Sequence, residues 1–172
     1  MILSSADFIN NDTIYLAQKL IGKYVVRKFA NNTLAKYLIT EVEAYHSMAD
    51  KANHARFGKT NRTEVLFKTG GRWYVTLCYG VHYLLNLVTG EEGNPSAVLI
   101  RGINEVVGPG KVTKLLKVDR SFNNLEATEN NNLWLEDHNF KVQNITALPR
   151  VGINYAQEYK DKLWRFKLNN NF

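Results

Sequence analysis

Cysteine is almost absent from this chain of 172 residues, because Cys78 is the only one. A single cysteine excludes an internal disulfide framework and any zinc or iron–sulfur site built entirely from thiolates. Apolar runs are short as well, and none approaches the roughly 20 residues that a membrane-spanning helix requires. The opening residues lack the basic segment followed by a long apolar segment that marks a secretory signal. We therefore expect a reducing, intracellular compartment.

Proline is also scarce, with three residues, whereas apolar residues make up 45% of the chain. This composition is typical of an ordered globular protein, and the length suits one domain with a proper core rather than two. No repeat, linker or compositional break divides the sequence, so residues 1–172 are predicted to form a single domain. The net charge of +6 suits a polyanionic partner such as nucleic acid, but a lysine-rich, ordinary surface explains it equally well.

Local patterns predict a mixed α/β domain of the α+β type with a largely antiparallel sheet. The predicted helices span 11–21 and 108–118, and the predicted strands lie within 23–45 (a hairpin turning at 31–32), 72–78, 81–88, 96–102, 132–137, 140–153 and 163–168. Asn11 or Asp12 can cap the first helix, and Val112, Leu115 and Leu116 should share one face of the second. Periodicity disappears from 46 to 71, and a connection that long is usually functional or mobile.

Two glutamates lie in the predicted strand "YLITEVEAY". Side chains alternate between the faces of a strand, so Ile39, Glu41, Glu43 and Tyr45 are expected to share one side. That side is neither a clean core face nor a clean solvated face. An edge strand with salt bridges is one interpretation. A general base beside an aromatic ring, with a pKa tuned by partial burial, is the other.

Four further side chains have both an ordinary and a functional interpretation. Tyr79, at a predicted hairpin apex, either covers its own hairpin or projects as a wedge between bases. Asn86 is either a hydrogen-bonded core amide or a pocket residue that tests the polar edge of a ligand. Arg101 either extends from a sheet edge to solvent or pairs with a carboxylate. His54 is an isolated loop histidine whose spacing from the preceding histidine does not match a zinc motif, so no metal site is predicted.

Taken in chain order, "TEVEAY", a histidine nine residues after its tyrosine, "YGVHYLLN", "VLIRG" and "GPGK" resemble the alkyladenine (3-methyladenine) DNA glycosylase family. The resemblance continues through "PRVGINYAQEY" and "LWRFKL" and covers nearly the whole chain. It implies a single compact domain with a curved antiparallel sheet. It also implies a monomer that removes damaged purines from double-stranded DNA, with neither metal nor organic cofactor. A cytoplasmic location, at the nucleoid in a bacterium, is the corresponding expectation.

The resemblance implies catalytic roles for two residues. Glu43 matches the general base that activates water for attack on the sugar, whereas Glu41 matches a family position to which we assign no chemistry. Arg101 matches an arginine that helps to position the water and the acid group. Tyr79 matches the tyrosine that intercalates where the damaged nucleotide has flipped out of the helix.

Three residues match the base pocket of the family. Tyr45 corresponds to an aromatic wall, His54 to a contact with the flipped base, and Asn86 to an asparagine that disfavours normal guanine. Where the family usually supplies a second aromatic wall this chain has Thr76, and no neighbouring ring is expected to substitute on that face. The loss of one stacking surface should narrow the range of neutral lesions, such as hypoxanthine or ethenoadenine, more than that of cationic 3-methyladenine and 7-methylguanine.

The basic residues Arg56, Lys59, Arg62 and Lys111 are expected phosphate contacts. Thr63 stands where the family often has asparagine, and we attach no prediction to this difference. A non-catalytic damaged-DNA binding protein on the same scaffold is the main alternative function. A bifunctional glycosylase with lyase activity would need a pocket lysine, which the family pattern does not offer. An RNA-binding module is disfavoured, because neither an RNA-recognition motif nor a Gly-x-x-Gly clamp is present.

Overall fold

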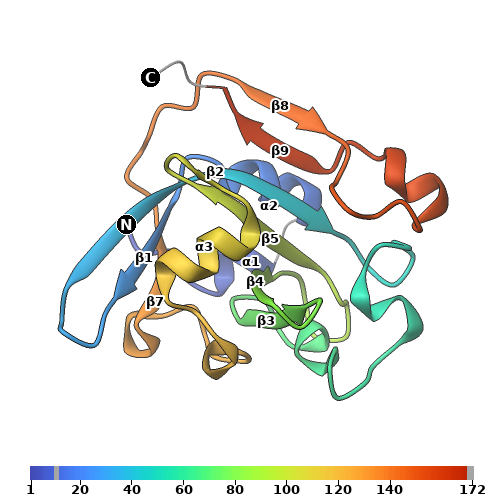
Figure 1. The fold of residues 1–172 in the computed structure, drawn as a ribbon, viewed down its shortest axis with the longest axis horizontal. Helices are drawn as coiled ribbons and strands as arrows, with labels where there is room; N and C mark the ends of the chain where they lie inside the picture. The colour runs from blue at the N-terminus through green and yellow to red at the C-terminus, as the bar shows by residue number, and fades with distance from the viewer. Residues whose placement is uncertain (10–11, 170–172) are drawn as a thin grey trace.

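The computed structural model describes residues 1–9 and 12–169 (Figure 1). The α-helices within them are α1 (Ala6–Ile9), α2 (Thr13–Leu20) and α3 (Pro109–Leu116). The strands are β1 (Tyr24–Lys28), β2 (Leu34–Tyr45), β3 (Trp73–Cys78), β4 (His82–Val88), β5 (Ala97–Ile103), β6 (Val106–Val107), β7 (Leu133–Glu136), β8 (Ile145–Leu148) and β9 (Arg165–Leu168). Short 3₁₀ turns, numbered η1 to η5, lie between them. In the described residues no helix is long and apolar enough to cross a bilayer.

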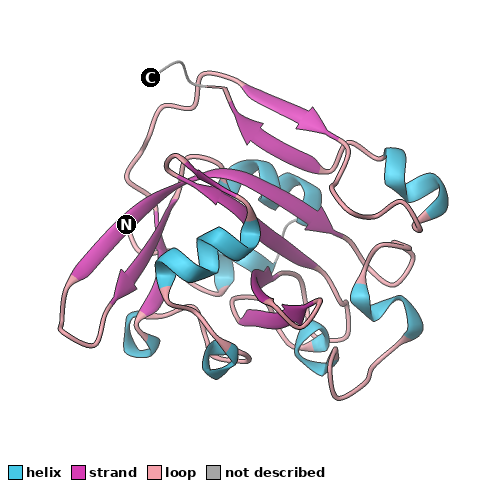
Figure 2. Ribbon diagram, viewed as in Figure 1, coloured by secondary structure: helices cyan, strands magenta, loops and turns pink. Residues whose placement is uncertain are grey.

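The strands form one nine-stranded sheet with the main order β3-β4-β5-β2-β1-β7. Every strand pairing is antiparallel, so the predicted α+β class with a largely antiparallel sheet is confirmed. The long strand β2 pairs with β1 through its first half and with β5 and β9 through its second half. Figure 2 shows the strands fanning out, with the β8–β9 hairpin at one edge. The second half of β2 therefore lies at the centre of the molecule.

The two longer helices lie on the sheet, with α3 in front of it and α2 behind it in the view of Figure 1. Asp12 caps α2, because its side chain accepts hydrogen bonds from the backbone N–H groups of Ile14 and Tyr15 at 2.9 and 3.1 Å. The other predicted cap, Asn11, lies outside the described residues. In α3, Val112 and Leu116 are buried as predicted. Leu115, predicted to share their face, is 37% exposed.

The predicted strand 140–153 is wrong except for β8. Phe140 and Val142, which precede β8, pack against the main hydrophobic core without joining the sheet. Val142 lies against Gly22, where an added Cβ would be 2.5 Å from its Cγ2 atom. Gly22 also has a φ of +83°, a conformation that favours glycine. The elements α1 and β6 have no counterpart among the predictions, because segments this short carry no readable periodicity.

The segment from 46 to 71 is irregular, as predicted, but contains two short 3₁₀ turns. These are η1 (His54–Phe57) and η2 (Glu64–Phe67). The Asn53 side chain caps η1 by accepting a hydrogen bond from the Ala55 N–H at 3.0 Å, and its amide donates to the carbonyls of Ser47 and Pro95. These contacts attach the segment to the start of β5, beside the second half of β2.

Candidate active site

The pairing of β2 with β5 is irregular where the two glutamates lie. The register shifts on both sides of Glu41, which leaves Thr40 on β2 and Arg101 on β5 without a partner residue in this pairing. Such bulges re-aim side chains and are common beside active sites. Ile39 is fully buried in the main core. The predicted grouping of Ile39 with Glu43 is therefore wrong, because the bulge interrupts the alternation on which it depended.

Glu43 is completely buried, with 0% of its surface exposed. Its Oε1 atom accepts a hydrogen bond from the Val151 backbone N–H at 2.7 Å, and its Oε2 atom accepts one from the Tyr45 hydroxyl at 2.8 Å. Arg101 Nη1 lies 3.5 Å from Oε1. Burial raises the pKa of the Glu43 carboxyl above its ordinary value, although Arg101 and the two hydrogen bonds partly offset this increase.

Glu41 binds arginines. Its Oε1 atom accepts hydrogen bonds from Arg101 Nε at 3.2 Å and from Arg165 Nη1 at 3.1 Å. Arg101 thus bridges the two glutamates, and Glu41 fixes the direction of its guanidinium. The edge-strand interpretation is wrong, because this part of β2 pairs with β5 on one side and β9 on the other, although Glu41 does form salt bridges. Glu43 lies beside an aromatic ring, and its role as a general base stays a prediction.

A pocket lies next to Glu43, on the face of the sheet that carries Tyr45. Its lining residues are Tyr45, Asn53, His54, Leu66, Tyr74, Leu84, Asn86, Ala97 and Leu99. The structure therefore brings together three of the predicted pocket residues, which come from β2, η1 and β4. Glu43 is linked to this pocket through its hydrogen bond with Tyr45 and through its pairing with Leu99 on β5.

His54 is a neutral imidazole at ordinary pH. Burial, followed by the charges of Arg62 and Arg56, lowers its pKa to about 4. Its Nδ1 atom lies 3.2 Å from the Tyr74 hydroxyl. A neutral ring can both donate and accept hydrogen bonds, so His54 can contact a ligand without adding a positive charge.

Asn86 is a hydrogen-bonded amide that also lines the pocket, and its contact with a ligand stays a prediction. Its side-chain amide donates to the Tyr74 carbonyl at 3.1 Å, and the same residue lines the pocket. The hydrogen bond ties β4 to β3 and holds the side chain in one orientation. Such fixed polar groups give a pocket its specificity.

Thr76 lies outside this pocket. It is 6% exposed, and it lines a separate hollow at the edge strand β3 with Arg62, whose Nη2 atom lies 3.3 Å from Thr76 Oγ1. The aromatic residue Tyr74, on the same face of β3, does line this pocket. The expectation that no neighbouring ring substitutes on this face is therefore wrong. The residue identity at Thr76 could not reveal this, because the position of Tyr74 depends on β4 and η1.

Tyr79 stands at the apex of the β3–β4 hairpin and is 93% exposed. Cys78 pairs with His82, so Tyr79 belongs to a three-residue loop, and its φ of +51° is unusual for a residue with a side chain. Val81 in the same loop is exposed as well. The ring therefore does not cover its own hairpin, which was the ordinary interpretation.

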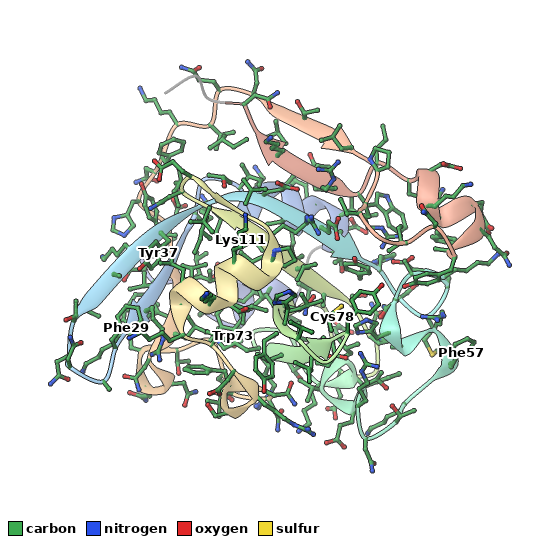
Figure 3. All side chains as sticks on the ribbon, in the orientation of Figure 1. Phe29, Tyr37, Phe57, Trp73, Cys78 and Lys111 are labelled. Carbon is green, nitrogen blue, oxygen red and sulfur yellow. The ribbon has the colours of Figure 1, made fainter. Side chains whose placement is uncertain are left out.

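The four basic residues predicted to contact phosphates lie in different surroundings. Lys59 and Lys111 are exposed. Lys111 stands on α3 and lines a surface hollow with Val81 and His82 of the hairpin, and Figure 3 shows it in front of the sheet. Arg56 is stacked between the rings of Phe57 and Tyr155, with its guanidinium carbon 4.5 and 5.1 Å from their centroids. Arg62 is the residue that contacts Thr76.

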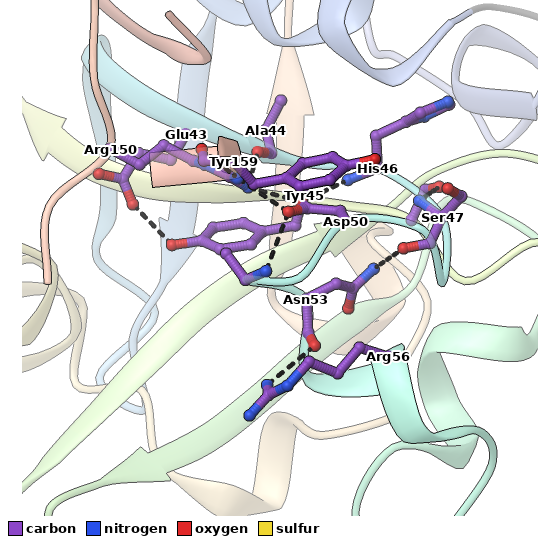
Figure 4. Close-up of polar contacts among 12 residues, drawn as sticks. Glu43, Ala44, Tyr45, His46, Ser47, Asp50, Asn53, Arg56, Arg150 and Tyr159 are labelled. Carbon is purple, nitrogen blue, oxygen red and sulfur yellow. Dashed lines mark hydrogen bonds and ion pairs between the residues drawn. The ribbon is translucent and has the colours of Figure 1, made fainter. Parts of the chain in front are cut away.

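An ion pair that the sequence did not indicate supports the pocket from behind. Arg150 and Asp50 are fully buried and form two hydrogen bonds of 2.6 and 2.8 Å (Figure 4). Arg150 also donates to the Ala44 carbonyl at 2.9 Å, and its guanidinium carbon lies 4.7 Å from the Tyr45 ring centroid. The next residue, Val151, donates to Glu43. Asp50 lies in the segment without periodicity and Arg150 in the predicted strand 140–153, and a pairing across 100 residues leaves no local signal.

The described residues contain no cluster of three or more His, Cys, Asp or Glu side chains arranged to hold a metal ion. Cys78 is a free, partly exposed thiol beside the hairpin apex.

Comparison with known proteins identifies the family. The model of the methylpurine-DNA glycosylase family matches residues 7–108 and 104–172. A protein of Borrelia garinii subsp. bavariensis is 40% identical over 178 residues, which cover 95% of each chain. Proteins of Borreliella burgdorferi and Natranaerobius thermophilus are 38% and 35% identical, over 95% and 96% of this chain and 95% and 94% of their own. All three carry the name "Putative 3-methyladenine DNA glycosylase". This chain belongs to the methylpurine-DNA glycosylase family, a family of DNA glycosylases.

Proposed function

We propose that this protein is a monofunctional DNA glycosylase that hydrolyses the N-glycosidic bond of alkylated purines in duplex DNA. The proposed substrates include 3-methyladenine and 7-methylguanine, with neutral lesions such as hypoxanthine and ethenoadenine as further candidates. The damaged nucleotide would flip into the pocket, and the resulting abasic site would enter base excision repair. The observation that carries the proposal is a completely buried glutamate, Glu43, hydrogen-bonded to the aromatic residue Tyr45 of the adjacent pocket.

In this mechanism, water attacks the C1′ atom of the deoxyribose as the purine leaves. Glu43 accepts the proton of that water, and its carboxylate stabilises the positive charge that develops on the sugar. Each carboxylate oxygen has two lone pairs and accepts one hydrogen bond, so acceptor sites remain for the water. Arg101, oriented by Glu41, favours the ionised form of Glu43 against the effect of burial.

The pocket residues have corresponding proposed roles. The Tyr45 ring offers an electron-rich face to a cationic purine. The neutral His54 would hydrogen-bond to the flipped base, and Asn86 would discriminate against normal guanine by crowding its amino group. Tyr79 would fill the space that the flipped nucleotide leaves, because its exposed ring stands at the hairpin apex.

A non-catalytic protein that binds damaged DNA is the second candidate. The presence of Thr76, in a hollow outside the pocket, favours it, because an aromatic side chain is usual at this position in the family. Such a protein would have no use for a general base.

The decisive experiment measures release of 3-methyladenine from methylated duplex DNA by wild type and Glu43→Gln. We expect a loss of about 10²–10⁴-fold in the variant, the range typical of a missing general base. Glu136→Gln is the matched control, because Glu136 is another buried, hydrogen-bonded carboxylate of the same sheet and lies on the strand at the opposite edge from β3. A wild type that binds the DNA but releases no base would replace the glycosylase with the binding protein.

A further inference from the structure

Arg62 is exposed, but its side chain reaches back to the sheet. Its Nη2 atom lies 3.3 Å from the hydroxyl of Thr76, on the edge strand β3. Thr76 pairs with Leu84 across the β3–β4 hairpin and shares a face of β3 with Tyr74. Both Leu84 and Tyr74 line the base pocket. The hydrogen bond to Thr76 thus places the guanidinium beside the pocket.

The loop that carries Arg62 is fixed by its neighbour, Thr63. The Thr63 side chain is buried, accepts a hydrogen bond from the Thr60 N–H at 2.9 Å and donates to the Gly58 carbonyl at 3.1 Å. The Thr63 N–H in turn donates to the Thr60 carbonyl at 3.0 Å. These bonds close the loop on itself immediately before η2. The backbone of Arg62 is therefore anchored, which supports a defined direction for its side chain.

The effect of Arg62 extends into the pocket. Its charge is the second cause, after burial, that lowers the pKa of His54. Burial raises the pKa of the Tyr74 hydroxyl, and Thr76 and Arg62 partly offset that increase. These directions agree with the position that the Thr76 contact gives the guanidinium, beside the lining residues Tyr74 and His54.

We infer that Arg62 is a specificity-determining residue that reaches a base in the pocket from the neighbouring hollow and favours neutral purine lesions over cationic ones. Thr76 is its positioning residue. The inference rests on the proposed glycosylase function, and it reverses the expectation that the loss of an aromatic wall penalises neutral lesions. It also assigns Arg62 to the base rather than to a phosphate.

The physical basis is the shape and charge of the guanidinium group. Its plane can stack on the π-face of a base, and its N–H groups can donate to a carbonyl oxygen such as that of hypoxanthine. Its fixed positive charge repels a cationic purine. The lining residue His54 is neutral, so it neither adds to this charge nor offsets it. Arg56 adds a second cation to the surroundings of His54. The Glu43 carboxylate is the opposing charge, beside Tyr45.

The test compares single-turnover excision of hypoxanthine and 7-methylguanine from duplexes of identical sequence. For Arg62→Gln we expect a fall of about tenfold for hypoxanthine and an unchanged or higher rate for 7-methylguanine, a change that corresponds to about 1.4 kcal/mol. Thr76→Val, which removes the hydroxyl that holds Arg62, should change the ratio in the same direction. Arg62→Lys keeps the charge but not the plane, so it should not restore hypoxanthine excision. Lys59→Gln removes one exposed charge from the same loop and is the control. It should change the two excision rates by the same factor and leave their ratio unchanged.

Binding supplies a second measurement that does not require turnover. In a Glu43→Gln background, Arg62→Gln should weaken binding to a hypoxanthine duplex but not to the same duplex with an abasic site. Equal effects of Arg62→Gln on both lesions and on abasic DNA would overturn the inference and make Arg62 a phosphate contact, while the proposed function would stand. A wild type that excises neither lesion nor 3-methyladenine would overturn the proposed function and this inference with it.

Discussion

Burial disfavours the charged forms of Glu43 and His54, which both lie at the pocket, but the consequences differ. For His54 it lowers the pKa to about 4 and keeps the ring neutral, which suits a residue that contacts a base. For Glu43 it raises the pKa, which makes the carboxylate a stronger base than an exposed glutamate but requires a cation to keep it ionised. Arg101 is the largest of the opposing influences on Glu43. The pH dependence of activity is therefore a property of this pair.

We predict that base excision falls on the acid side through the pKa of Glu43, at a pH above the titration range of an exposed glutamate. Arg101→Gln should lower the rate and also move this acid limb to higher pH, because the remaining burial raises the pKa further. The measurement is the pH profile of single-turnover excision for the two proteins. Identical acid limbs would show that Arg101 acts only by positioning.

The β3–β4 hairpin carries its exposed aromatic residue at the cost of an unusual backbone conformation at Tyr79. Tyr79 has no role in the core, since almost all of its surface is exposed. Its retention at a strained, solvated position fits a contact with DNA better than a contribution to stability.

Tyr79→Ala should change the free energy of unfolding by no more than about 0.5 kcal/mol. The same substitution should weaken binding to lesion DNA by about 1–3 kcal/mol, the value of one base–aromatic stack. Thermal unfolding and binding in a Glu43→Gln background measure the two effects separately. Val81→Ala in the same loop is the matched control, and equal losses in both variants would argue against a specific wedge.

Arg150 connects three parts of the site, and no continuous sequence pattern links them. It pairs with Asp50 after β2, contacts the Tyr45 ring, and precedes Val151, whose N–H donates to Glu43. The alignment of the candidate base with the pocket wall thus depends on a buried ion pair. The Arg150 Nε atom is buried without a hydrogen-bond partner among the described residues, so the cost of burying this ion pair is not fully compensated.

Arg150→Met should destabilise the protein by about 3–5 kcal/mol, because it leaves the buried Asp50 charge unpaired. The double variant Arg150→Met/Asp50→Leu should regain much of that loss, since neither charge remains. Denaturant unfolding of the single and double variants measures the coupling. A double variant no more stable than Arg150→Met would contradict this account of the cost.

At the scale of the whole molecule, the net charge is +6, and three of the basic residues lie near the pocket or the hairpin. Arg56 lies on the same 3₁₀ turn as His54, Lys59 follows that turn, and Lys111 lies beside the hairpin loop. Because phosphate contacts release counterions, these residues should make DNA binding dependent on salt.

If these three residues each contact one phosphate, log K should fall with log[salt] at a slope of about −2.7, or roughly 40-fold between 50 and 200 mM. Lys59→Gln or Lys111→Gln should reduce the slope by about 1. Arg62→Gln should leave it unchanged. Titrations of abasic DNA at several salt concentrations measure these slopes. A slope that neither Lys59→Gln nor Lys111→Gln changes would remove the proposed backbone contacts.

The antiparallel sheet, helices α2 and α3 and the order of the site motifs were predictable, because alternation, helical periodicity and capping are local properties of the chain. The resemblance of the ordered motifs to the family identified Glu43, Tyr45, His54 and Asn86. The structure brings these residues to one site. The short elements α1 and β6 and the unpaired segment before β8 were not predictable, since they depend on packing against distant residues.

By itself, the sequence determined the fold class, the family and the identities of the candidate chemical groups. Only the tertiary structure decided how those groups face one another. The bulge at Thr40 and Arg101 breaks the alternation of β2, the Asp50–Arg150 pair joins segments far apart in the chain, and Thr76 binds Arg62 rather than lining the pocket. Each of these contacts is between residues that are distant in sequence, so its energy depends on a geometry that no local pattern encodes.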